Sequence, residues 1–356
     1  MKKITPPKLK LPKRKKKQTL PPRITNETVA EHREHILAGG RRFKYPHQYV
    51  KHRLVINATI IGIVAILLVI VLGWWQLYIV QNTSEFMYRV TRVVPVPVAA
   101  VDGQMASYSD YLMRYRSQLL WLTDKGQLGL SKQDDQRQFD YYKRSVMDGL
   151  EADTYAQKRA SQLGVSVSDK EVQTVIDNNR NTATGRISQE VYDASTKDTL
   201  GYSPDEYRHI IKQALTRQKV SYKVDTTATK TKEALETQLK QPSPSLEAIA
   251  AMLNKEVTKV DFGASGYVPL NNLDEGRTQQ AAKLAPGQIS PVFQATNGNG
   301  YYVVQLIGKN NQQLSYQYLH IGLTVFDNEL TKLKKDHKVS EFISIPALKT
   351  EVQKEN

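Results

Sequence analysis

The chain has 356 residues, enough for a membrane segment and one or two domains. It contains no cysteine, which excludes disulfides, a thiolate nucleophile and cysteine-based metal sites. The formal net charge is +15, but residues 1–53 contain 16 Lys and Arg against three Glu, so the remainder, with 34 basic and 32 acidic side chains, is nearly neutral. The charge therefore describes a tail and predicts no nucleic-acid-binding surface on the rest of the protein.

Residues 1–53 form this basic tail, which contains prolines at positions 6, 7, 12, 21 and 22. Such a composition cannot bury a core and predicts disorder in a cytoplasmic tail. A short helix over residues 28–37, with Asn26 as its cap, is the exception. Basic residues beside a membrane attract anionic lipid headgroups, so residues 2–53 are expected to bind lipid. Binding to nucleic acid or the ribosome is the alternative, but no aromatic interleaving or motif supports it.

Residues 54–80 contain no charged side chain and are long enough to cross a bilayer as a helix. Trp74, Trp75 and Tyr78 lie where aromatic side chains meet headgroups, and the Lys and Arg excess before the segment places the N-terminus in the cytoplasm. A cleaved signal peptide is the weaker alternative, because the run is too long and has no small-x-small cleavage site. We therefore expect a single-pass anchor in the cell membrane, with residues 81–356 outside the cytoplasm.

The first part of this exterior is predicted to be helical. A linker (81–95) leads to an edge strand in VPVAAV, since Pro95 and Pro97 lack amide donors, and Asp102-Gly103 then forms a tight turn. Start and stop signals such as Ser168–Glu171, Ser203-Pro204 and Gly164 predict helices, with a loop at 178–186. The expected helices span residues 107–122, 132–163, 168–180 and 203 to beyond 222.

After residue 229 the pattern changes to α+β. Helices are expected near residues 230–240, 246–254, 279–284 and 328–335. Strands are expected at 257–262, 301–307, 314–323 and 341–345, with 308–313 joining two of them as a hairpin. Residues 346–356 are predicted to be a C-terminal tail.

Three stretches resemble, in order, the chaperone domain of the SurA/PrsA/PpiD group of extracytoplasmic foldases. They are VPVAAVDGQMASYSDYLMRYR, LEADTYAQKRASQLGVSVSDKEV and LGYSPDEYRHIIKQAL. The resemblance implies a SurA N-like helical domain over residues 96–228 that binds unfolded exported polypeptides. Tyr108, Tyr111 and Tyr115 share one face of the first helix and are candidate client contacts, although a core stripe would give the same pattern.

The stretch LAPGQISPVFQATNGNGYYVVQLIGK is similar to the end of a parvulin-type (PpiC-like) prolyl isomerase domain, with Tyr302 where that family has a histidine. The family's first strand, with its Ser-His-Ile pattern, is missing from residues 220–224. A similar pattern occurs later, in SYQYLHIGL, and contains His320. We interpret residues 229–345 as a circularly permuted parvulin-like domain; a domain that only borrows the fold is the alternative.

The parvulin resemblance also implies the site. His320 and Tyr302 would take the positions of the two central histidines, with Asp261 as a candidate acid. Tyr267, Phe293 and Leu306 are candidate walls of a proline pocket or, alternatively, plain core. Because one histidine is a tyrosine and cysteine is absent, the resemblance implies weak or absent isomerase activity. We expect no cofactor and no metal site, since the histidines form no ligand pair such as H-E-x-x-H.

Together these patterns predict a single N-terminal transmembrane helix, then a mainly α SurA N-like chaperone domain and an α+β parvulin-like domain. The expected function is a membrane-anchored foldase or holdase for unfolded or proline-containing exported polypeptides. The rival is an envelope scaffolding protein whose basic tail binds anionic lipid or a cytoplasmic partner.

Overall fold

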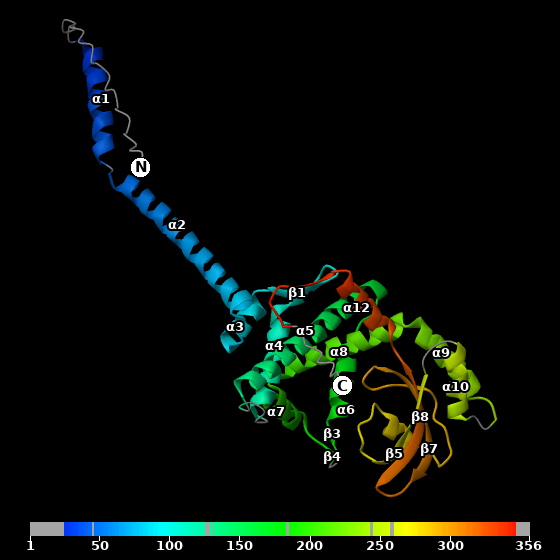
Figure 1. Cartoon of the computed structure of the whole chain (residues 1–356). Helices are drawn as coiled ribbons and strands as arrows, with labels where there is room; N and C mark the ends of the chain where they lie inside the picture. The colour runs from blue at the N-terminus through cyan, green and yellow to red at the C-terminus, as the bar shows by residue number, and fades with distance from the viewer. Residues whose placement is uncertain are drawn as a thin grey trace, which may run out of the picture. The chain divides into compact units, whose positions relative to one another are not determined.

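The computed structural model describes residues 25–44, 46–124, 129, 131–182, 185–242, 245–256 and 260–346 (Figure 1). The chain divides into two units, residues 1–73 and residues 74–356. The C-terminal tail predicted at 346–356 lies almost entirely outside the described residues, as do residues 1–24 of the basic tail.

The first unit is helical where it is described. Helix α1 spans Asn26–Lys44, and α2 spans Pro46–Trp74. The disorder predicted for residues 1–53 is therefore wrong for residues 26–44 and 46–53. The helix expected at 28–37 is present but longer, because no proline interrupts the sequence between Pro22 and Pro46. Thr25 rather than Asn26 takes the capping position before the first turn: its amide donates to the Thr28 hydroxyl at 2.9 Å, and that hydroxyl donates to the Thr25 carbonyl oxygen at 2.8 Å.

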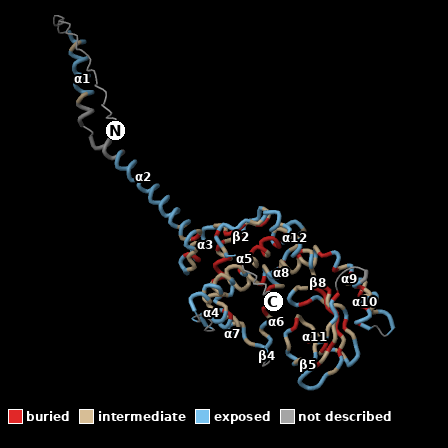
Figure 2. The backbone as a smooth tube through the Cα atoms, in the orientation of Figure 1, coloured by how far each residue is buried: buried red, intermediate tan, exposed pale blue. Residues whose placement is uncertain are grey.

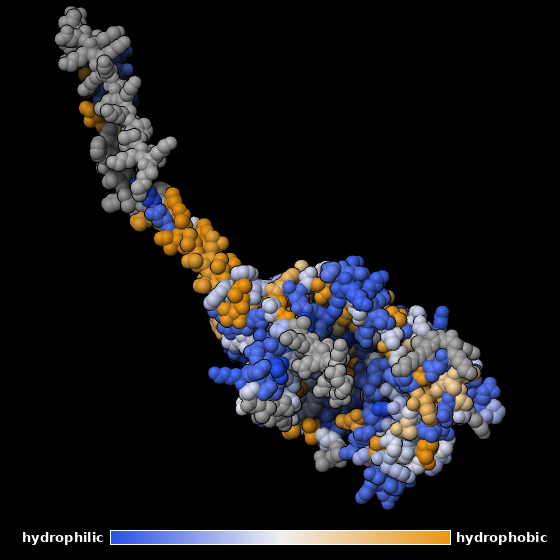
Figure 3. Space-filling view, viewed as in Figure 1, coloured by the Kyte–Doolittle hydropathy of each residue, from blue (hydrophilic) through white to orange (hydrophobic). Residues whose placement is uncertain are grey.

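Helix α2 continues into a π-helical turn, Trp75–Ile79. Within the described part of the chain, Arg53–Ile79 is the one helical stretch long and apolar enough to cross a membrane. Its most apolar window is not buried against any protein, and its residues are exposed from 53 to 72 (Figures 2 and 3), whereas Leu77 near its end is buried. The helix agrees in length and position with the segment predicted at residues 54–80.

Helix α3 (Glu85–Val93) occupies most of the predicted linker, residues 81–95, so that prediction is wrong. The side chain of Ser84 caps the helix by accepting a hydrogen bond from the Met87 amide. Met87 and Tyr88 are buried. Burial of these two side chains stabilises α3 as a helix. The helix is short, so its sequence pattern gives only a weak signal.

A three-stranded sheet follows, in the order β2-β1-β9, from β1 (Pro97–Val101), β2 (Gln104–Ser107) and β9 (Val339–Glu341). The turn at Asp102-Gly103 is confirmed, with φ angles of 47° and 86°. Strand β1 is central, however, and not the edge strand we predicted. Pro97 is tolerated there because β9 pairs only with Ala99–Val101, beyond the proline.

Five helices complete the helical part, and the sequence signals placed four of them. Capping boxes at Ser168 and Ser203 open α6 and α8, and Gly164 ends α5 with φ of 63°. Helix α7 was not predicted, because Thr196 is its one buried residue and it shows no apolar stripe. The expected loop at 178–186 contains a short hairpin, β3 (Asn181–Thr182) and β4 (Gly185–Arg186). The helices are α4 (Tyr108–Asp124), α5 (Lys132–Leu163), α6 (Asp169–Asn179), α7 (Gln189–Leu200) and α8 (Pro204–Val224).

The α+β part is an antiparallel sheet in the order β5-β8-β7-β6. Helices α9 (Thr226–Gln238) and α10 (Leu246–Glu256) pack on the face containing Tyr301 and Leu319, and α11 (Arg277–Ala281) packs on the face containing Leu306 and Tyr316. The predicted hairpin is confirmed, since β7 and β8 pair along their length. The strands are β5 (Val260–Pro269), β6 (Phe293–Gln294), β7 (Gly300–Lys309) and β8 (Gln313–Gly322).

The chain then returns to the helical part. Phe326 and Leu330 of α12 (Val325–Lys335) pack with Tyr155 of α5, and Ile343 joins the core around Tyr108. Residues 325–345, which we assigned to the parvulin-like domain, therefore pack with the helices instead. The strand expected at 341–345 forms at 339–341, because the open edge of β1 supplies its partner there.

The chain passes between the helical part and the sheet part twice, after α8 and before α12. Both connections contact one buried carboxylate, that of Asp225. It accepts hydrogen bonds from the amides of Ala228 at 2.8 Å, Thr324 at 2.8 Å and Val325 at 3.2 Å. Asp225 thus caps α9 and also holds the start of α12. A carboxylate removed from water is tolerated there because backbone donors satisfy it.

Charged side chains fasten α12 and β9 to α5. The carboxylate of Glu151 is fully buried, and burial raises its pKa. Lys334 of α12 lies 2.7 Å from it, and the Arg144 guanidinium is 3.6 Å away. Arg144 also pairs with Glu341 of β9 at 2.7 Å.

We predict that Lys334→Met destabilises the second unit by about 2–3 kcal/mol, because it removes the nearest cation from a buried carboxylate. The exposed Lys335 on the same helix is the matched control, and Lys335→Met should cost less than about 0.5 kcal/mol. Urea unfolding at pH 7.5 measures both. The difference in unfolding free energy between Lys334→Met and the wild type should be smaller at pH 5 than at pH 7.5. At the lower pH, Glu151 can bind a proton in the folded state because its pKa is raised, and a neutral carboxyl needs no cation. Equal unfolding midpoints for the two variants would contradict this.

We predict that Gly300→Ala disrupts the β7–β8 pair, at a cost of about 3 kcal/mol or more. Gly300 has φ of 149°, and an added Cβ would lie 2.0 Å from the backbone oxygen of Ile321. At Gly308 of the same strand the nearest atom to such a Cβ is the end of the Tyr267 side chain, at 3.0 Å. Gly308→Ala should therefore cost less than about 1 kcal/mol, as measured by thermal unfolding.

Candidate functional site

The register of the four-stranded sheet places four side chains in one row across it. Asp261 of β5 pairs with His320 of β8, which pairs with Tyr302 of β7, which in turn pairs with Phe293 of β6. The three residues proposed for isomerase chemistry thus lie on neighbouring strands. This row also places the strand that contains His320 beside the strand that contains Tyr302, as the permuted arrangement requires.

His320 is held on three sides. Its ring stacks on that of Tyr302, with centroids 4.4 Å apart and an interplanar angle of 16°. Its Nε2 lies 3.3 Å from the carbonyl oxygen of Asn299, and its Nδ1 lies 3.9 Å from a carboxylate oxygen of Asp261. The His320 side chain keeps 18% of its surface exposed, so solvent or a small group can reach it.

Tyr302 is buried, and its hydroxyl donates a hydrogen bond to Glu275 at 2.5 Å. Burial raises the pKa of Tyr302, and the hydrogen bond to Glu275 raises it further, so the phenol stays protonated near neutral pH. The Arg277 guanidinium lies over the same ring, 5.1 Å from its centroid. Tyr302 therefore acts as a fixed hydrogen-bond donor whose proton is already committed to Glu275.

Glu275 organises this corner, and our sequence analysis missed it. It also accepts hydrogen bonds from the side-chain amides of Asn297 at 2.9 Å and Asn299 at 2.8 Å. Its φ of 64° lies in the left-handed region, which costs a non-glycine residue energy. The dipeptide Glu275-Gly276 marks a turn in the sequence, but no sequence pattern shows that the turn faces Tyr302.

The three proposed pocket walls have different surroundings. Phe293 stacks on Tyr302 at 6.1 Å and belongs to the row. Leu306 is fully buried against α11, so it is core rather than a wall. Tyr267 pairs with Ser315, which is an odd number of positions from His320 along β8, so Tyr267 lies on the opposite face of the sheet from His320. It is 63% exposed, and neither it nor Leu306 lines a pocket beside His320.

The tyrosines proposed as client contacts are core residues. Tyr108, Tyr111 and Tyr115 are 0%, 2% and 3% exposed. The Tyr108 hydroxyl donates to the Leu77 carbonyl oxygen at 2.5 Å, and the rings of Tyr111 and Tyr115 stack. That prediction is wrong, because the face they share is the stripe that α4 buries.

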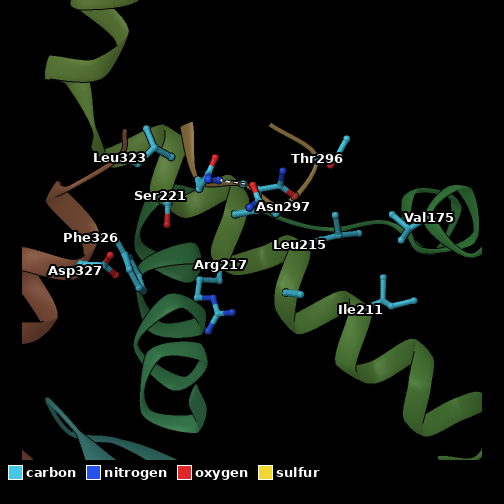
Figure 4. Close-up of a pocket in the computed structure, with 14 residues that line it drawn as sticks. Val175, Ile211, Leu215, Arg217, Ser221, Thr296, Asn297, Leu323, Phe326 and Asp327 are labelled. Atoms are coloured by element: carbon cyan, nitrogen blue, oxygen red, sulfur yellow. Dashed lines mark hydrogen bonds between the residues drawn. The ribbon is translucent and has the colours of Figure 1, made fainter. Parts of the chain in front are cut away.

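An open cleft of about 380 Å³ lies between the helical part and the sheet (Figure 4). Ile211 and Leu215 enter it from α8, and Val175 from α6. Phe326 and Leu323 lie on another side, and a loop with Thr296 and Asn297 forms its rim. The remaining lining residues are mostly polar: Ala214, Arg217, Gln218, Ser221, Gly298, Asn299 and Asp327.

The cleft and the row meet at Asn299. Its carbonyl oxygen faces His320, its side-chain amide binds Glu275, and it lines the cleft. Two hydrogen bonds fix this loop to α8: Gln218 donates to the Ala295 carbonyl oxygen at 3.3 Å, and Tyr222 to that of Gly300 at 2.5 Å. A chain lying in the cleft would therefore pass close to His320.

The described ranges hold no group of three His, Asp or Glu side chains placed to bind a metal ion. What the row offers is hydrogen bonding by one histidine and one buried phenol.

A search of curated proteins found no match to this chain. Residues 49–221 match the family model of the SurA-like N-terminal domain, which supports a relationship to the SurA and PpiD group.

Proposed function

We propose that this protein is a membrane-anchored chaperone outside the cytoplasm, which binds unfolded exported polypeptides in the cleft between its helical part and its sheet. The SurA-like N-terminal domain indicates a chaperone-type role in protein folding. That match is the observation on which the proposal rests, and the matched residues include Ile211 and Leu215 on the wall of the cleft.

The cleft suits an unfolded chain. Apolar side chains such as Ile211, Leu215 and Phe326 would contact client side chains. The side-chain NH2 groups of Gln218 and Asn297 each have a second N–H beyond the bonds to Ala295 and Glu275, and these would donate to client backbone. Its charged lining residues, Arg217 and Asp327, have opposite signs, so the lining has no net charge. The mixture favours changing clients over one fixed partner, and so favours a chaperone over the rival envelope scaffold.

We further propose that residues 53–79 anchor the protein in the cell membrane. The basic residues before this helix would remain in the cytoplasm, next to anionic headgroups, and residues 81–356 would lie outside.

The sheet would serve as a degenerate parvulin-like domain. A catalyst of prolyl isomerisation needs only to bind the twisted amide better than the planar forms. Here the Tyr302 hydroxyl already donates its hydrogen bond to Glu275, and Leu306 and Tyr267 form no pocket beside His320. The geometry therefore supports weak or absent isomerase activity and a mainly binding role.

We predict that residues 74–356 suppress the aggregation of an unfolded secreted protein, measured by light scattering. The fragment should start at residue 74, because Leu77 is part of the core and Tyr78 donates to the Pro97 carbonyl oxygen. Ala214→Trp fills the cleft from an exposed position and should weaken suppression severalfold. Lys223→Trp, exposed on the same helix but outside the cleft, should not. No suppression at stoichiometric excess would rule out the chaperone role.

Uncatalysed cis-to-trans conversion of an X-Pro peptide takes about tens to hundreds of seconds. We predict that this protein accelerates the conversion by less than about tenfold. His320→Ala should abolish whatever acceleration exists, while the exposed His337→Ala should leave it unchanged. Acceleration that survives His320→Ala would show that the row is not the catalytic site.

A further inference from the structure

Exposed apolar side chains gather at the start of the second unit. We call them the apolar collar: Trp74, Trp75, Ile79, Phe86, Val93, Val94 and Phe342, each at least 40% exposed. Phe86 and Val93 are among the most exposed, at 71% and 82%. Figure 3 shows hydrophobic surface around α3. Large apolar side chains grouped in this way need a cover.

Helix α3 has two apolar faces, one buried and one exposed. Met87, Tyr88 and Thr91 face the core, while Phe86, Val90 and Val93 follow at i, i+4 and i+7 along another face. Phe86 and Val93 are exposed and Val90 is partly buried. One apolar face of the helix therefore packs on the protein core, and the second is largely exposed.

The position of α3 relative to the end of the apolar helix is fixed by packing. Leu77 shares one core with Met87 and Tyr88. Between them the chain reverses tightly, since the Asn82 amide donates to the Gln76 carbonyl oxygen at 2.9 Å and Gln81 has φ of 53°. Residues 80–84 span at most about 18 Å even when extended, so the second face of α3 stays close to residue 79.

The C-terminal segment extends the collar. Phe342 lines one recess with Trp74, Tyr78 and Ile79. The Gln81 side chain donates to the Ser344 carbonyl oxygen at 2.8 Å, and the Phe342 amide donates to Val98. The collar therefore combines the end of the apolar helix, α3 and the chain's return segment, which hydrogen bonds and a shared recess hold together.

Basic side chains accompany the apolar face. Arg89 and Arg92 of α3 are 76% and 56% exposed, and both retain donors beyond their pairs with Glu85 and Glu206. Apolar side chains between exposed arginines are the composition of helices that lie in a bilayer interface, where the arginines meet headgroup phosphates.

We propose that the collar rests in the outer leaflet of the membrane that residues 53–79 cross, with α3 lying in the interface. This inference rests on the proposed membrane anchor. Lipid is the expected cover because the collar continues the apolar helix. Trp74, Trp75 and Ile79 belong to that helix, so lipid that surrounds them also meets the adjoining face of α3. The second unit would then be held against the bilayer at one fixed orientation rather than on a free tether.

The absence of cysteine allows a direct test. Single substitutions Phe86→Cys and Val93→Cys in the full chain, labelled with an environment-sensitive fluorophore, are reconstituted into vesicles of phosphatidylcholine and phosphatidylglycerol. We expect lipid-borne nitroxide quenchers to reduce the fluorescence of both labels at least twofold more than aqueous iodide does. Leu273→Cys, 91% exposed in the sheet part, is the control and should show the reverse order.

Ile66→Cys, inside the apolar helix, separates the two hypotheses. If lipid quenches the label at Ile66 but iodide quenches those at Phe86 and Val93, the anchor stands and the collar inference is wrong. If iodide quenches Ile66 as well, the anchor itself fails and the collar inference with it. Protection of Phe86 and Val93 from both quenchers would assign the collar to a second protein surface and would overturn the inference too.

Discussion

The arrangement of the second unit depends on the return of residues 325–345 to the helical part. Strand β9 completes the sheet of β1, Ile343 enters the core around Tyr108, and Lys334 reaches the buried Glu151. Without this return the sheet would hang from a single connection after α8. With it, the sheet is an insertion between α8 and α12, and the cleft gains Phe326 and Leu323. The cleft therefore depends on this return of the chain.

The sequence predicted elements well where a local rule decides them. The bounds of α5, both capping boxes and the β7–β8 hairpin follow from cap residues, turn residues and periodicity. The sequence did not predict elements that depend on contacts with residues far along the chain. Helix α3 exists because its short face meets Leu77 and its neighbours, and β1 is central because a strand from the far end of the chain pairs with it. No window of sequence contains those partners.

The site shows the same division. The sequence predicted that the strands of His320 and Tyr302 are neighbours, and the register places these two residues opposite each other. The permuted parvulin-like arrangement itself stays a prediction. The role of Glu275 depends on a loop conformation with positive φ, which side-chain pattern does not encode. The tyrosines of α4 illustrate a limit of composition: a face of aromatic residues is compatible with client binding or with core, and burial alone distinguishes them.

The carboxylate of Asp225 has a mechanical consequence. Two chain segments cross between the helices and the sheet, and this one side chain binds both of them. Gln218 and Tyr222 of α8 add hydrogen bonds to the carbonyl oxygens of Ala295 and Gly300, so the sheet is attached to the helical part at more than its two chain connections. The same helix lines the cleft, and its position relative to the sheet therefore sets the width of the cleft. Loss of the Asp225 carboxylate would remove the bonds at both chain connections at once.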